Sequence, residues 1–377
     1  MKKNLILICI DGGRVDRAKN SSIIQNFRKE NSIFFSQSIT YAPYTNSAIH
    51  ALISGAYGNR NGCDSYWHSY EFNHNKFKTI VDYLHENNYY TCADVPTNLI
   101  MPKQNYDEYY ISDESSIDLK THHYELLCKM KKLVDSKQKI FLHLHYSGIH
   151  EGIRDTVLKF FTNYSKEFFE NRKQNEERYD ALFTDAEKYL EYIHEKLDEL
   201  NLWENSIIII FSDHGIGLGE KFGERAYGAF CYESTINTFY SYFSSDLKHK
   251  EITSQVRSVD FMPTILEHLG IKLDTNFEPL DGVSLFPLIN DQNPKENFAY
   301  TETGNPLDSK IPPKKPNTKS IRTSEWKLIV NEHNDTKELY DLKNDPLEEN
   351  NLINTGLEIE SILWEEFLKI QEKSVIN

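Results

Sequence analysis

The sequence predicts an α/β fold with a mostly parallel central sheet, helices on both faces, and a small C-terminal antiparallel sheet with a helix. Strand-like apolar runs recur at Leu5–Ile10, Lys139–His145 and Ser206–Ser212. Helical patterns separate these runs, which is typical of parallel strands covered on both faces. After residue 290 the composition turns polar and the pattern becomes that of a hairpin. We therefore expect a large α/β domain followed by a small α+β subdomain.

The first strand, Leu5–Ile10, follows two lysines and superficially resembles a signal peptide. Its apolar run has only six residues, and no small-residue cleavage site follows it. We interpret the run as a buried parallel strand that ends at Asp11. No apolar run in the sequence approaches the ~20 residues that a membrane span needs.

The third strand, Ser206–Ser212, contains four consecutive isoleucines. The segment before it, Tyr179–Leu202, has apolar residues at i, i+3 and i+4, which predicts a helix. Residues 151–178 are charged and aromatic without a clear period. We expect them to form an insertion beside the site, in the position of a lid, within a catalytic domain of residues 1–290.

The remaining residues, 291–377, are expected to form the C-terminal subdomain. Residues 308–319 have the composition of a loop, and residues 319–332 have the pattern of a β-hairpin. Residues 338–352 fit a strand followed by a turn, and a terminal helix is expected at about 355–372.

The formal net charge is −15, from 42 basic and 57 acidic residues, and no Lys/Arg run of the kind found in nucleic-acid binders occurs. An acidic enzyme with an anionic substrate needs local positive charge, which a metal ion supplies. The five cysteines are odd in number and form no C-x-x-C pair. This usage favours a reducing, cytoplasmic compartment and argues against a cysteine-based zinc site.

Polar side chains follow each of the three predicted strands. Asp11 follows the first, His150 lies just beyond the second, and Asp213 and His214 follow the third. The carboxyl ends of parallel strands share one edge, so these groups should meet there. Carboxylate oxygens suit Mn, Mg or Ca, and imidazole shifts the preference toward Mn or Zn. Asp213 and His214 alone would also fit a capping carboxylate and a hydrogen-bonded histidine, but Asp11 favours the metal site.

Thr45 precedes a helix predicted over Ser47–Ile53. A helix N-terminus favours negative charge on an alkoxide and on a bound phosphate or sulfate. Metal coordination would lower the pKa of a threonine hydroxyl enough for nucleophilic attack. The alternative is that Thr45 only caps the helix. His150 has two open interpretations: it donates a proton to a leaving group, or it is structural.

Lys221 and Arg225 lie in a glycine-spaced segment, residues 219–228, and either side chain suits contact with an anionic oxygen. The alternative for both is solvated surface charge. His143 and His145 alternate within the second strand, and we predict structural roles for both.

Together these segments resemble the sulfatases of the alkaline phosphatase superfamily over most of the chain. The resemblance rests on "NLILICIDGGR", "APYTNSAIHALISGAYGNRNG", "NSIIIIFSDHGIGLGEKFG" and the C-terminal "IRTSEWKLIVN…KELYDLKNDPLEENNL". It implies that one metal ion is held by Asp11, Thr45, Asp213 and His214. It also implies that His150 faces the leaving group.

The sequence departs from the sulfatase pattern at the nucleophile. Thr45 stands where a sulfatase has the Cys or Ser that is oxidised to formylglycine, and threonine cannot yield that aldehyde. Ser47 and Ile49 replace the Pro and Arg of the maturation motif. The resemblance therefore points to superfamily members with a metal-bound threonine, which transfer or cleave phosphate groups. It implies one divalent ion (Mn, Zn, Ca or Mg, with Mn or Zn favoured) and no formylglycine.

Other departures concern the metal count and the substrate contacts. Gly12 and Tyr146 stand where two-metal members have aspartates, so we expect one tightly held metal. The pocket lysine of sulfatases is absent, and Thr97 or Asn98 lies near its place. Asn46, beside the predicted nucleophile, could donate a hydrogen bond to a phosphate oxygen.

We predict a metal-dependent hydrolase or transferase of phosphoryl-type esters: a phosphodiesterase, a phosphomonoesterase or a phosphotransferase. Thr45 would attack phosphorus and His150 would protonate the leaving oxygen. Two alternatives stay open: a sulfuryl-ester hydrolase without formylglycine, and a non-catalytic relative that binds an anion or a partner. Without a membrane span, the expected substrate is a small anionic phosphate ester, such as a nucleotide, a sugar phosphate or a glycan precursor.

Overall fold

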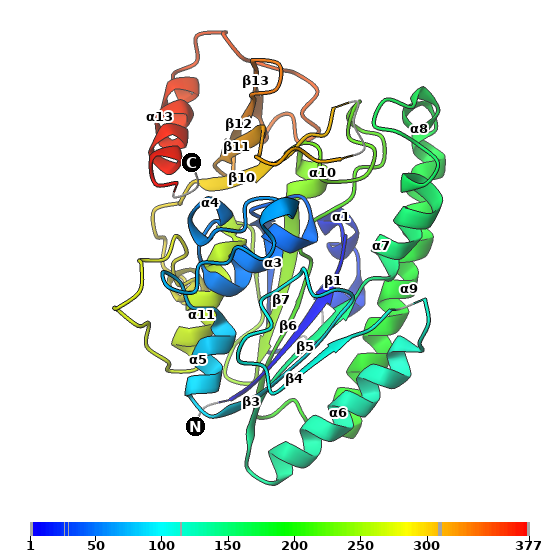
Figure 1. The fold of residues 1–377 in the computed structure, drawn as a ribbon, viewed down its shortest axis with the longest axis vertical. Helices are drawn as coiled ribbons and strands as arrows, with labels where there is room; N and C mark the ends of the chain where they lie inside the picture. Colours follow the sequence, from blue (N-terminus) through cyan, green and yellow to red (C-terminus); the bar gives the residue numbers. More distant parts are fainter. Residues whose placement is uncertain (1–2, 26, 29, 114, 308–310, 375–377) are drawn as a thin grey trace.

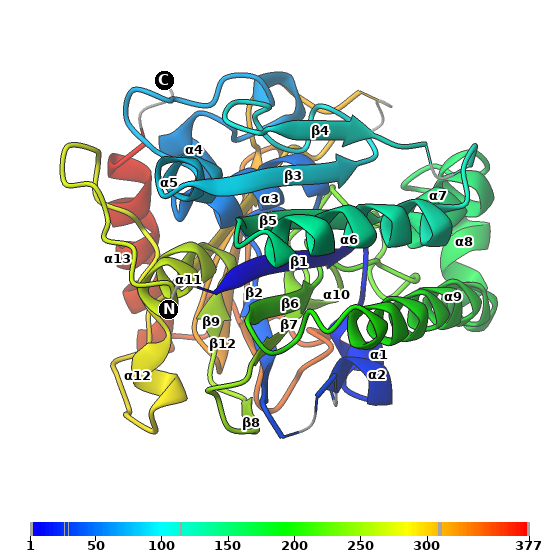
Figure 2. The same cartoon turned by 90° about the horizontal axis from the view of Figure 1, so that it is seen from below.

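A large sheet covered by helices and a small sheet at one end make up the molecule (Figures 1 and 2). The computed structural model describes residues 3–25, 27–28, 30–113, 115–307 and 311–374. Part of the predicted loop 308–319, residues 308–310, lies outside the described residues. Within the described ranges, no helix is long and apolar enough to cross a membrane. All five cysteines are free thiols.

The main sheet has nine strands over the described residues. They are β1 (Asn4–Ile10), β2 (Ser32–Ile39), β3 (Tyr89–Val95), β4 (Glu108–Ile111), β5 (Lys139–Tyr146), β6 (Ser206–Phe211), β7 (Asn237–Ser244), β8 (Lys250–Ile252) and β9 (Val256–Arg257). Their order is β4-β3-β5-β1-β6-β7-β2-β8, and β9 pairs with β2. All pairs from β4 to β6 are parallel, whereas β7 runs antiparallel to β6 and β2. The predicted mostly parallel sheet is confirmed.

The three strands predicted from apolar runs are neighbours at the centre of the sheet. β1 lies between β5 and β6, with Leu5 paired to Phe141 on one side and to Ile207 on the other. Every residue of β1 and β6 is buried. Burial on both faces explains why these strands are continuous apolar runs rather than alternating patterns. The parallel register brings the carboxyl ends of all three strands to one edge.

Side chains of β1 alternate between two cores. Ile6, Ile8 and Ile10 belong to the core under α6 and α9, while Leu5 and Leu7 belong to the core under α3, α5 and α11. Figure 1 shows these two helical layers on opposite faces of the sheet. The helices are α3 (Thr45–Ser54), α5 (Ile80–Glu86), α6 (Leu119–Asp135), α9 (Arg172–Glu199) and α11 (Phe261–His268).

The segment predicted as an irregular insertion, residues 151–178, is largely helical. It contains the second half of α7 (Gly148–Ile153), a π-helical turn (Arg154–Leu158), α8 (Lys166–Glu170) and the start of α9. Asn175 is buried, and its Nδ2 donates to the carbonyl oxygens of Phe168 and Leu218. These contacts of Asn175 hold the insertion in place. The contact with Leu218 joins residues distant in sequence, so the sequence periodicity could not predict it. A lid role for the segment stays a prediction.

The C-terminal part forms the predicted antiparallel sheet and helix. The strands β10 (Ala299–Thr303), β11 (Thr318–Arg322), β12 (Trp326–Asn331) and β13 (Thr336–Asp341) pair in chain order, and α13 (Glu358–Glu372) follows. The hairpin expected at 319–332 is the β11–β12 pair. Leu363 and Phe367 of α13 pack in one core with Ile321 and Leu328 of the sheet.

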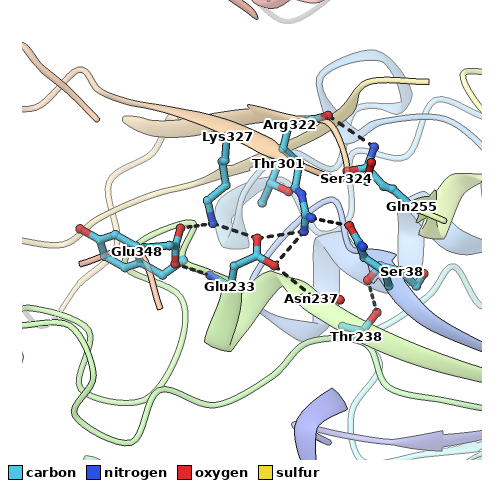
Figure 3. Close-up of polar contacts among 12 residues, drawn as sticks. Ser38, Glu233, Asn237, Thr238, Gln255, Thr301, Arg322, Ser324, Lys327 and Glu348 are labelled. Carbon is cyan, nitrogen blue, oxygen red and sulfur yellow. Dashed lines mark hydrogen bonds and ion pairs between the residues drawn. The ribbon is translucent and has the colours of Figure 1, made fainter. Parts of the chain in front are cut away.

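A buried ionic network joins this small sheet to the main body (Figure 3). Glu233 on α10 (Glu233–Ile236) accepts hydrogen bonds of 2.9 and 2.8 Å from Nη1 of Arg322 and one of 3.1 Å from Nζ of Lys327. Lys327 is fully buried and also pairs with Glu348. Buried charges are tolerated only when they are paired, so the network constrains how the subdomain sits on the main sheet.

Candidate active site

Residues from three adjacent strand ends meet at the carboxyl edge of the sheet. Nε2 of His214 lies 3.5 Å from Oδ1 of Asp11 and 3.6 Å from Oδ2 of Asp213. Nδ1 of His150, on α7, lies 3.5 Å from Oδ1 of Asp11. The parallel pairing of β5, β1 and β6 produces this meeting, because each residue follows one of these strands.

Thr45 is the first residue of α3, so the helix begins two residues earlier than the predicted Ser47. Tyr44 is the N-cap residue, and Thr45 therefore does not cap the helix. Oγ1 of Thr45 lies 3.3 Å from Oδ2 of Asp11 and 3.4 Å from Nε2 of His214. The threonine hydroxyl, two carboxylates and an imidazole thus face one another in a buried corner.

The hydrogen bonds around this corner leave cation-binding atoms free. Nδ1 of His214 donates to the carbonyl oxygen of Gly215 at 2.8 Å, so the neutral ring keeps its lone pair on Nε2. Oδ1 of Asp213 accepts from the backbone N–H groups of Gly12 and His214, while its Oδ2 has no hydrogen-bond partner. Oδ1 of Asp11 is also buried without one. These orphaned atoms fit a divalent cation.

Among the described His, Cys, Asp and Glu side chains, Asp11, His150 and His214 form a group whose possible ligand atoms lie within 4.8 Å of one another. This group differs from the predicted ligand set, because it includes His150 and omits Asp213. Asp213 remains a candidate, because its free Oδ2 lies beside Nε2 of His214. Carboxylate and imidazole donors together suit Mn or Zn and also accept other divalent ions.

The pKa values of the two carboxylates shift in opposite directions. Burial tends to raise the pKa of Asp11, but the charge of His150 and a hydrogen bond from His145 hold it well below its usual range. Burial and the charge of Asp11 raise the pKa of Asp213. Two carboxylates this close resist ionising together unless a positive charge lies between them. The electrostatics therefore agree with a cation site.

His145 has a contact that the sequence did not reveal. Its Nε2 donates to Oδ2 of Asp11 at 3.1 Å, and the ring is buried. His143, two residues earlier on the same strand, has no hydrogen-bond partner on either ring nitrogen. The alternation of residues along the strand does not distinguish His143 from His145, because both point to the same face of the sheet. Only the pairing of His145 with Cys9, close to the end of β1, brings it near Asp11.

Tyr227 is a second residue that the sequence analysis missed. Its hydroxyl lies 3.3 and 3.4 Å from the two ring nitrogens of His150, and its ring packs on His214 with centroids 4.7 Å apart. Burial and the nearby Tyr66 and Asp11 raise the pKa of Tyr227 well above its usual value. Tyr227 lies within the glycine-spaced segment in which the two candidate basic residues were sought.

Those two basic residues are engaged elsewhere. Nζ of Lys221 donates to the carbonyl oxygen of Glu348 in the C-terminal subdomain, and its contact with substrate stays a prediction. Nη1 of Arg225 donates to the carbonyl oxygens of Leu158, at 3.2 Å, and Phe161. Arg225 thus binds the insertion of residues 151–178 through backbone carbonyls. It also lines a cavity beside the site.

Asn46 follows Thr45 on α3 and is buried. Its Nδ2 donates to Oγ of Ser69 at 3.0 Å, so a phosphate contact would have to replace or share this bond. Tyr146 stacks on Tyr189 with ring centroids 4.6 Å apart, at the place where a second aspartate was sought.

Comparison with known proteins agrees with this geometry. The family model described as Sulfatase matches residues 3–271, and the model described as N-sulphoglucosamine sulphohydrolase, C-terminal, matches residues 228–373. Arylsulfatase K of Rattus norvegicus is 29% identical over 228 residues, which cover 58% of this chain and 39% of that protein. The multifunctional alkaline phosphatase superfamily protein PehA of Trinickia caryophylli is 29% identical over 131 residues, covering 33% of this chain and 24% of PehA. The chain thus spans less than half the length of these relatives.

Solved structures share the fold over nearly the whole chain. BT4656, in complex with its substrate D-glucosamine-2-N,6-O-disulfate, superposes with a TM-score of 0.73 at 16% identity, covering 100% of this chain and 99% of that one. The phosphonate monoester hydrolase of Agrobacterium radiobacter has a TM-score of 0.74 at 12% identity, covering 99% and 95%. Since the Sulfatase model alone spans more than half of the sequence, the chain belongs to the sulfatase family, within the alkaline phosphatase superfamily.

Proposed function

We propose that this sulfatase-family hydrolase acts on phosphoryl-type esters, as a hydrolase or transferase, with Thr45 as covalent nucleophile. The supporting observation is the position of Thr45 Oγ1, 3.3 Å from Asp11 and 3.4 Å from His214. A threonine in this position cannot become the aldehyde on which formylglycine sulfatases depend. A hydroxyl held against a cation site is instead suited to in-line attack on phosphorus.

Asp11, Thr45, Asp213 and His214 would hold one divalent metal ion, and His150 lies within reach of the same site. When bound, the ion would lower the pKa of the threonine hydroxyl and offset negative charge on the transferred group. His145 hydrogen-bonds to Asp11, and the backbone N–H groups of Gly12 and His214 donate to Asp213, so both carboxylates would be held in place for the ion. This orientation lowers the reorganisation needed when the substrate arrives.

The other steps would depend on His150 and the start of α3. His150 would donate a proton to the leaving oxygen, and the hydroxyl of Tyr227, 3.3 and 3.4 Å from the ring nitrogens, would hold the imidazole in place. Backbone N–H groups in the first turn of α3 would meet the oxygens of the transferred group. Water or an acceptor hydroxyl would then release Thr45.

The charges near the site favour a phosphodiester over a phosphomonoester. Lys221 and Arg225 donate to the backbone carbonyls of Glu348, Leu158 and Phe161 rather than to side chains of the corner around Thr45, so neither is positioned there to pair with a second negative charge. A diester carries one negative charge, whereas a monoester carries nearly two at neutral pH. The smaller charge matches a corner whose positive charge comes from one ion and His150.

The test compares esters that share one leaving phenol: an aryl methyl phosphate diester, an aryl phosphate monoester and an aryl sulfate. With Mn or Zn bound, we expect the diester to have the highest kcat/KM. A higher value for the sulfate would favour the alternative of a sulfuryl-ester hydrolase, which the family membership also supports. No turnover of any ester would favour the non-catalytic alternative.

A further inference from the structure

A cavity of about 560 Å³ opens beside the candidate active site. Tyr227 lines it and also contacts His150 and His214. The cavity therefore lies on the side of the site where His150 would protonate a leaving oxygen. Its walls come from the 3-10 turn Tyr66–His68, from the insertion, from the segment after β6, and from the segment between β10 and β11.

Two aromatic side chains form a preorganised wall of this cavity. Tyr66 stacks on Tyr44 with ring centroids 4.5 Å apart and an interplanar angle of 19°. Nε1 of Trp67 donates to the carbonyl oxygen of Pro312 at 2.9 Å. Even so, Trp67 is 51% exposed and Tyr66 is 39% exposed. Large aromatic rings held in place but left uncovered provide apolar faces for a ligand.

The cavity carries one positive charge and no negative one. Among the described residues that line it, Arg225 is the only charged one, and none is a carboxylate. Nη1 of Arg225 donates to the carbonyl oxygens of Leu158 and Phe161, while its Nε is buried without a hydrogen-bond partner. A cationic group on the ligand would therefore find no counter-charge in the cavity.

We propose that this cavity binds the leaving group, and that it selects a planar ring without positive charge, stacked against Trp67 and Tyr66. The inference rests on the proposed function, because it assumes that an ester is cleaved beside His150. It adds a substrate class: esters whose leaving alcohol is flat and carries no positive charge. Esters with a cationic or a bulky non-planar leaving group would bind poorly.

Binding is measured by calorimetry on the Mn-loaded Thr45→Val protein, which keeps the side-chain shape and lacks the nucleophile. The probes are phenyl methylphosphonate and cyclohexyl methylphosphonate. We expect the phenyl ester to bind about tenfold more tightly than the cyclohexyl ester, a difference typical of one good aromatic contact. Adding Trp67→Ala should remove this preference. Equal affinities for the two probes, or an unchanged preference in the Trp67→Ala protein, would overturn the proposal.

The matched control is Tyr70→Ala. Tyr70 is an aromatic residue of the same loop, is 69% exposed, and is not among the residues that line the cavity. Its replacement should leave both affinities unchanged. A loss equal to that of Trp67→Ala would contradict ring binding at Trp67 and Tyr66.

Turnover by the wild-type protein separates the two proposals. If the phenyl preference and its dependence on Trp67 are found but no phosphate or phosphonate ester is cleaved, the proposed function fails and the ring-binding site stands. If esters are cleaved without any preference among leaving groups, the proposed function stands and the ring-binding site fails.

Discussion

Nε2 of His145 donates a 3.1 Å hydrogen bond to Oδ2 of Asp11, and both side chains are buried. This contact orients one candidate metal ligand. The His145→Phe protein should therefore bind Mn or Zn about 10–100-fold more weakly, which is the usual effect of losing a hydrogen bond to a ligating group. Equilibrium dialysis with metal analysis measures the affinity directly.

His143 provides the control for that substitution, since it lies on the same strand without a partner for either ring nitrogen. Burial lowers the pKa of His143 well below its usual value, so the ring is neutral and unsatisfied. The His143→Phe protein should keep full metal affinity and equal or greater thermal stability. Equal losses of metal affinity in the two variants would show that the contact with Asp11 is not what matters.

Metal binding should stabilise the fold through Asp213 and its free Oδ2. A ligand that binds only the folded protein raises the melting temperature as its concentration rises above Kd. We expect Mn or Zn to raise the Tm of the wild type and to leave that of Asp213→Asn unchanged in differential scanning fluorimetry. Asp246→Asn, which alters a partly exposed carboxylate beside His268, should respond like the wild type. A full metal response in Asp213→Asn would remove Asp213 from the ligand set.

Lys327 should be important for stability rather than for chemistry. Its Nζ is buried and contacts Glu233, Glu348 and the carbonyl oxygen of Cys231. The Lys327→Met substitution leaves buried carboxylates unpaired and should cost about 3–5 kcal/mol of unfolding free energy. Urea denaturation measures this loss.

The control for Lys327 is Lys343→Met, which breaks the exposed pair with Glu325. Surface pairs contribute little, so no measurable change is expected. If Lys327→Met were as stable as this control, the network in Figure 3 would not hold the subdomain in place.

Stability should depend on pH through Glu224. Burial raises the pKa of this carboxyl from 4.5 to about 8, against the opposing effect of hydrogen bonds from the backbone of Phe230 and Ala229. A carboxyl whose pKa is raised in the folded state binds its proton more tightly there, so its contribution to stability declines as pH rises from 4.5 to about 8. Glu224→Gln removes this titration. The Tm of Glu224→Gln minus that of the wild type should therefore increase with pH across that window, and a constant difference would contradict the shift.

The fold was largely predictable because buried parallel strands leave continuous apolar runs. Leu5–Ile10 and the isoleucines of β6 point to both faces of the sheet and are buried throughout. A continuous apolar run this short is typical of a buried parallel strand. The start of α9 was not predictable. Its first turns are held by contacts such as that of Asn175 with Leu218, which involve residues distant in sequence.

The candidate site could be predicted where strand ends determine position. Asp11, Asp213 and His214 meet because their strands are adjacent, and parallel topology implies that meeting. The roles of loop side chains could not be inferred in this way. Lys221 and Tyr227 belong to one segment, yet Lys221 contacts the C-terminal subdomain and Tyr227 contacts His150. Only the path of the loop in space distinguishes them.

The central claim is that Thr45 becomes covalently modified during turnover, and acid quenching followed by mass spectrometry of the peptide that carries Thr45 tests it most directly. With the metal-loaded protein and an aryl methyl phosphate diester, the account predicts a methyl phosphate group on Thr45. The same adduct should form in Thr45→Ser and be absent in Thr45→Val. Turnover by Thr45→Val at the wild-type rate, or an adduct on another residue, would contradict the account.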